Sequence, residues 1–119
     1  MRTWRQAAQQ LHDIMSVLQG FTVSSDPGYV PTTFPTVIIA PPRLNWDTYS
    51  TSQPTEAVFA LYVIVRSDPL AVDNLDPALS SVVDAVWSMP DAVVTQAIPA
   101  PYGAVDQLPC YVVNVEVSL

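Results

Sequence analysis

An uninterrupted apolar run, AVFALYVIV at 57–65, constrains the fold of this chain more than any other stretch of its sequence. The run is too short to cross a membrane as a helix, which needs about 20 residues. Its β-branched and aromatic residues, and the turn-forming residues before it, favour a strand that we place at 56–66. Because side chains alternate along a strand, these residues divide into two faces that must be covered by different partners.

Both faces of the predicted strand are apolar over most of their length. The first face is wholly apolar and comprises Ala57, Phe59, Leu61, Val63 and Val65. The second is polar only at its ends and comprises Glu56, Val58, Ala60, Tyr62, Ile64 and Arg66. The first face predicts helices packed against it inside the domain. The second has no obvious cover from its own chain, and a subunit interface would supply one.

Composition limits the class of protein to a small, folded, acidic domain. A chain of 119 residues forms one domain, and its 50% hydrophobic and 13% charged residues argue against overall disorder. A net charge of −7, with four arginines and no lysine, argues against a surface that grips nucleic-acid phosphates. A single cysteine cannot form an internal disulfide, and MRTWRQAAQQLHD (1–13) lacks the apolar core of a signal peptide. We therefore expect a protein that is made in the cytoplasm and has no membrane segment.

Two stretches carry the signals of helices. Apolar residues recur every three or four positions over 3–19, and Thr3 can cap the start of that helix. A second helix is predicted at about 77–89, because Asp76 followed by proline is typical of a helix start. Asp68 is also followed by proline, but there we expect only a short turn before the second helix.

The remaining strands and their connections define the fold class. Beside 56–66, the sequence predicts strands at 36–40, 92–98 and 110–119, and the last of these alternates cleanly between valines and polar residues. The segment 43–55 is polar and irregular, and it is long for a passive connection in so small a domain. We predict a single α+β domain over 1–119, with two main helices packed on one face of a four-stranded, mostly antiparallel sheet.

Residues that could carry chemistry are few and scattered. His12 is the only histidine, and Cys110 is expected to be a small buried residue. One residue of each type does not make a metal site. Asp68, Asp73 and Asp76 lack the spacing, the glycine and the distal glutamate of a calcium loop. We therefore predict no enzyme, no cofactor and no metal site.

Trp46 is the residue most suggestive of an interface. It lies in the polar 43–55 loop, where a solvent-exposed indole has no evident use. The loop either folds back so that Trp46 covers the sheet, or Trp46 anchors a contact with a neighbouring subunit. The predicted interface residues are Trp46, Arg43, Tyr49, Tyr62 and Ile64.

Four stretches follow the first helix in an order that resembles a known family. They are FPTVIIAPP (34–42), FALYVIVRSD (59–68), LDPALSSVVDAV (75–86) and YVVNVEVSL (111–119). In this order the chain resembles the tail terminator proteins of long-tailed, siphovirus-type bacteriophages. The resemblance covers nearly the whole chain, and it lies in a pattern of elements rather than in a catalytic signature.

The resemblance implies a structural virion protein assembled in the host cytoplasm. Such a protein forms a hexameric ring at the head-proximal end of the tail tube, stops tube polymerisation and offers a joining surface to the neck. Its implied partners are further copies of itself, the tail tube protein and the head–tail connector or neck proteins. Genome DNA would pass through the lumen without specific binding, which is consistent with the acidic charge.

Two alternatives stay open from the sequence. One is another neck component, such as a head–tail connector or head-closure protein. The other belongs to a different class and is a small cytoplasmic ligand-binding or enzymatic α+β domain.

Overall fold

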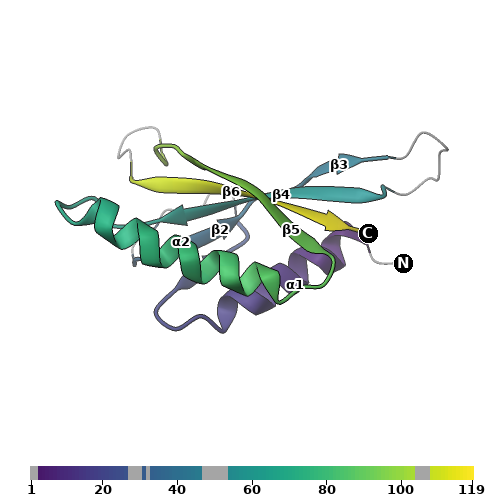
Figure 1. The fold of residues 1–119 in the computed structure, drawn as a ribbon, viewed down its shortest axis with the longest axis horizontal. Coiled ribbons are helices and arrows are strands. Elements are labelled where there is room, and N and C mark those ends of the chain that lie inside the picture. The colour runs from purple at the N-terminus through teal and green to yellow at the C-terminus, as the bar shows by residue number, and fades with distance from the viewer. Residues whose placement is uncertain (1–2, 27–30, 32, 47–53, 104–107) are drawn as a thin grey trace.

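The described part of the protein folds into a six-stranded mixed sheet with both helices on one face (Figure 1). The computed structural model describes residues 3–26, 31, 33–46, 54–103 and 108–119. The sheet order is β1-β2-β4-β6-β5, and β3 pairs with β4 beside β2. All pairs are antiparallel except β1 with β2. The elements are α1 (Trp4–Ser16), β1 (Thr22–Ser24), β2 (Thr36–Ile39), β3 (Arg43–Asn45), β4 (Glu56–Ile64), α2 (Ala71–Trp87), β5 (Ala92–Pro99) and β6 (Cys110–Ser118).

The α+β class and the placement of both helices on one face are as predicted, whereas the four-stranded sheet is too small. Strands β1 and β3 are additional, and β1 makes the sheet mixed. Each has three residues, which is too few to display an alternating pattern. Both strands form by pairing with a longer neighbouring strand, and this pairing cannot be predicted from the local sequence.

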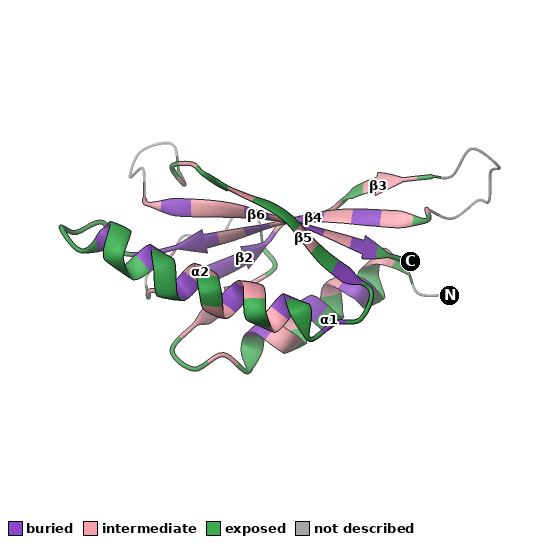
Figure 2. Ribbon diagram, in the orientation of Figure 1, coloured by how far each residue is buried: buried purple, intermediate pink, exposed green. Residues whose placement is uncertain are grey.

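Strand β4 contributes a fully buried row of side chains to the core, as its sequence predicts. It pairs with β6 along its whole length, from Glu56 opposite Ser118 to Ile64 opposite Cys110. The side chains of β4 that face the helices have no exposed surface: Ala57, Phe59, Leu61 and Val63. They pack with buried residues of both helices and of β6, and Figure 2 shows this core between the two layers.

Helix α1 begins with a reciprocal pair of hydrogen bonds. The Gln6 backbone N–H donates to Thr3 Oγ1 at 3.2 Å, and the Thr3 N–H donates to Gln6 Oε1 at 2.9 Å, which is a capping box. The helix ends at Ser16, earlier than the predicted 3–19. There the Leu18 N–H donates to the carbonyl of Met15, so the last turn tightens before Gly20 takes a positive φ of 81°.

Helix α2 begins at Ala71, so the predicted start at Pro77 is wrong. Asp68 begins the turn that leads into it, because its Oδ1 accepts a hydrogen bond from the Leu70 N–H at 2.8 Å. Asp76 is therefore not a cap, and Pro77 lies inside the helix. The turns before Pro77 are helical because Ala71 and Leu75 are buried in the core. This tertiary packing outweighs the tendency of proline to mark a helix start.

The position of Pro77 inside α2 leads to a stability prediction. Proline has no N–H to donate to the carbonyl of Asp73, and its ring crowds that carbonyl. Because Pro77 is exposed, Pro77→Ala should restore the bond without disturbing the core and raise the free energy of unfolding by about 1 kcal/mol or more. Thermal unfolding checks this, with Pro90→Ala beyond the helix as the control. An unchanged or lower melting temperature would argue that the helix begins at Pro77 after all.

Candidate functional site

The face of the sheet opposite α1 and α2 has no helix over it in the described residues (Figure 1). We call it the open face. Its centre combines apolar and polar side chains from three neighbouring strands, as the register of β4, β6 and β5 places them. These are Val58, Ala60, Tyr62, Val112, Asn114, Glu116, Val93, Gln96 and Ile98. Val93 and Ile98 keep 47% and 45% of their surface exposed, so part of this face is apolar and open to a partner.

Strand β5 forms one edge of the sheet and contains an irregularity that protects it. The pairing register with β6 shifts between Val94 and Gln96, which leaves Thr95 as the extra residue of a bulge. The Thr95 hydroxyl donates to the carbonyl of Asn114 at 3.3 Å. A bulge twists an edge strand and makes indiscriminate strand pairing less favourable.

A second apolar cluster closes one end of the open face. It contains Ile38, Ile64 and Cys110, with the rings of Phe34, Tyr62 and Tyr102 and the side chain of Leu108 packed around them. Tyr62 and Tyr102 meet edge to face, with ring centroids 5.6 Å apart. The prediction that this face lacks a cover from its own chain is therefore wrong at Ile64, which has no exposed surface. The side chains that cover Ile64 come from segments that are distant in the sequence and meet only in the folded chain.

The same cluster sets the chemistry of Cys110. Burial raises the pKa of its thiol to about 12, against an ordinary value of 9.0. Burial also raises the pKa of Tyr102, and the nearby Cys110 adds to the effect. Cys110 is thus a buried thiol with little thiolate character, as a structural cysteine should be.

We expect Cys110 to resist thiol reagents in the native protein. At about pH 8 a thiol with so high a pKa is ionised in roughly one molecule in ten thousand, so the native reaction should be at least about 100-fold slower than in concentrated guanidinium. Because the thiol ionises at a lower pH in the unfolded chain than in the native one, the free energy of unfolding should also fall as the pH rises from 9.0 toward about 12. Reaction with Ellman's reagent measures the first effect. Equal native and denatured rates would contradict burial of this residue.

The other end of the sheet, at β3, places two of the predicted interface residues together. Arg43 is exposed and pairs with Val58 of β4, and Trp46 follows β3 with 54% of its surface exposed. Between them, Asn45 is held by its Nδ2, which donates to Glu56 Oε1 at 2.8 Å. Leu44 packs on the core. We call residues 43–46 the β3 edge.

The five predicted interface residues therefore have different surroundings in the structure. Arg43 and Trp46 lie exposed at the β3 edge, Tyr62 is half-buried on the open face, and Ile64 is fully buried. Tyr49 lies outside the described residues. Because half of the Trp46 indole stays exposed, folding back onto the sheet does not account for its whole surface, and its interface role stays a prediction.

A groove in the described part of the chain is large enough to take a small molecule. It has a volume of about 480 Å³, lies beside the first half of α2, and is lined in part by Phe21, Phe34, Val65, Arg66, Pro77 and Ser81. The Arg66 guanidinium lies 5.9 Å from the centre of the Phe34 ring.

Within the described residues, no three His, Cys, Asp or Glu side chains lie close enough to hold a metal ion. In the same residues, no helix is long and apolar enough to cross a membrane.

Comparison with known proteins identifies the fold rather than a family. The described part of the chain is an α+β domain whose two helices share one face of the sheet. No family model and no curated protein matches the sequence. Among solved structures, the bacteriophage SPP1 gp17 protein superposes with a TM-score of 0.53 at 15% sequence identity. The match covers 100% of this chain and 95% of that one, so the two chains share their whole fold.

Proposed function

We propose that this protein is a structural component of a bacteriophage virion that forms a hexameric ring at the head-proximal end of the tail tube. The observation that carries the proposal is the fold shared with a bacteriophage protein over nearly the full length of both chains. The sequence resemblance to tail terminator proteins, which rests on the order of helices and strands, points to the same class.

The mechanism that we propose follows from how repeating assemblies end. Tube subunits add to one another through a single repeated interface, so growth continues until the exposed end no longer offers that interface. A ring that matches the tube on one side and differs on the other stops growth without any chemical reaction. The differing side is then free to receive the neck and to join the tail to the head.

Surfaces suitable for such contacts are present on the chain. The open face exposes Val93 and Ile98, and the β3 edge exposes Arg43 and half of Trp46. We expect further copies of this chain, the tail tube protein and the neck proteins to cover them. Genome DNA would pass through the ring without specific contacts, since a net charge of −7 per subunit repels phosphates.

Two other functions make different predictions. A head–tail connector or head-closure protein would bind portal-side rings rather than tube ends. A small ligand-binding domain would use the groove beside α2, where the phenyl ring of Phe34 and the Arg66 guanidinium could hold an aromatic or anionic molecule.

Deletion of the gene from its phage tests the proposal. We expect lysates that contain heads without tails together with tubes of irregular or excessive length, as seen by electron microscopy. Supplying the protein in trans should restore joined virions. Tails of normal length that fail to join would favour the connector function, and an unaffected phage would overturn both.

A further inference from the structure

The charges of this chain are segregated along its sequence. All four arginines precede residue 67, and four acidic residues in that half balance them. Residues 67–119 contain no arginine and no lysine, so this half carries the whole net charge of −7. Because the first half is neutral overall, like charges accumulate only in the second half.

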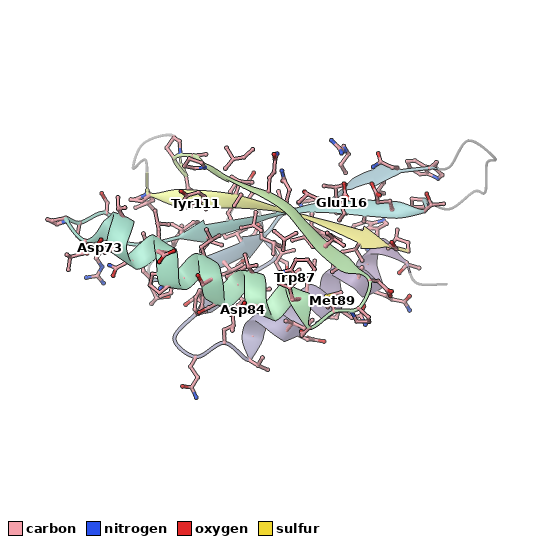
Figure 3. All side chains as sticks on the ribbon, viewed as in Figure 1. Asp73, Asp84, Trp87, Met89, Tyr111 and Glu116 are labelled. Carbon is pink, nitrogen blue, oxygen red and sulfur yellow. The ribbon has the colours of Figure 1, made fainter. Side chains whose placement is uncertain are left out.

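Three of the seven acidic residues in this half lie on α2. Asp73, Asp76, Ser80, Asp84 and Trp87 recur every three or four positions and are all exposed, so they form one stripe along the helix. Figure 3 labels Asp73, Asp84 and Trp87 along this helix. Trp87 keeps 56% of its surface exposed. We call these five residues the α2 stripe, and it combines three like charges with a large aromatic side chain.

The α2 stripe and the β3 edge lie on different sides of the domain. Helix α2 packs under β4, β6 and β5, whereas β3 pairs with the edge of β4 that faces away from β6 (Figure 1). Arg43 of β3 forms no ion pair with the described residues, and neither do Asp73, Asp76 and Asp84. Among the described residues, the Arg43 guanidinium and these three carboxylates thus lie unpaired on separate surfaces, while Glu56, which lies opposite β3 on β4, accepts a hydrogen bond from Asn45.

We propose that the α2 stripe of one copy docks on the β3 edge of the next copy, and this inference rests on the ring of the proposed function. Complementary charges orient two surfaces and disfavour wrong pairings. Each surface also carries a half-exposed indole, Trp87 on one and Trp46 on the other, and tryptophan is enriched among anchoring residues at interfaces. A contact between two different surfaces is heterologous, and repeated heterologous contacts close into a ring when the rotations between neighbouring subunits add up to a full turn.

Charge reversal tests the pairing of the two surfaces. Asp84→Arg and Arg43→Asp should each reduce the fraction of protein in rings at least tenfold, measured by sedimentation of the free protein and by imaging of tube ends. The chain that carries both changes should recover a ring fraction within about threefold of the natural protein, because the attraction is reversed on both sides. Ring formation by the natural protein should weaken as sodium chloride rises from about 0.05 to about 0.5 M.

The control variant is Asp13→Arg, which makes the same charge change on α1, where the exposed Asp13 accepts a hydrogen bond from Gln9. It should leave the ring fraction unchanged, and circular dichroism should show all variants to be folded. Rings that form equally well in both single variants would overturn this inference and leave the proposed function standing. A natural protein that forms no ring, either free or on tube ends, would overturn both.

Discussion

Removal of residues 113–119 is expected to leave the chain unable to fold. Strand β6 lies between β4 and β5, so its loss would separate β5 from the rest of the sheet. Val113, Val115 and Val117 have no exposed surface. Burial of each contributes about 1.5–3 kcal/mol, and together they approach the 5–15 kcal/mol total of a typical domain.

Circular dichroism and thermal unfolding of the truncated chain measure this effect. Ser118→Thr serves as the control, because Ser118 is exposed on the same strand, the change keeps its hydroxyl, and stability should change by less than about 0.5 kcal/mol. A soluble truncated protein that unfolds cooperatively would contradict the central place of β6.

Trp46→Ala is expected to prevent assembly while leaving the fold of the subunit intact. Truncation of an aromatic anchor typically costs about 2 kcal/mol or more at one interface. If the ring has six such contacts, the loss accumulates to about 12 kcal/mol per ring, which is enough to abolish assembly at ordinary protein concentrations.

Comparison with Leu44→Ala separates the two hypotheses for this segment. Leu44 packs on the core, so its truncation should lower the melting temperature. Trp46→Ala should instead change sedimentation and leave the melting temperature close to that of the natural protein. If Trp46→Ala lowers the melting temperature markedly and assembly is normal, then Trp46 covers the sheet rather than anchoring a neighbour.

The parts of the fold that the sequence predicts are those with long, regular patterns. Strands β4 and β6 have nine residues each, and their alternation is visible without knowledge of any neighbour. Strands β1 and β3 have three residues each, so their formation depends on pairing partners that are distant in sequence. The start of α2 differs from its prediction because buried residues before Pro77 hold two further turns.

In the candidate interface too, local features could be predicted from the sequence, whereas contacts between distant segments could not. Arg43 and Trp46 lie exposed in a stretch that is polar in the sequence, but β3 itself could not be predicted there, because three residues are too few to show an alternating pattern. Burial of Ile64 depends on Phe34, Tyr102 and Leu108, which approach it only in the folded chain. The segregation of charge is visible in the sequence, but its meaning depends on where the fold places α2 and β3.

Binding of the purified protein to purified tail tubes tests the central proposal most directly. Cryo-electron microscopy should show one extra sixfold layer at a single end of each tube, and tubes capped in this way should no longer lengthen when tube subunits are added. Protein bound along the sides of the tubes, or tubes that continue to lengthen at the same rate with the protein present, would contradict the proposal.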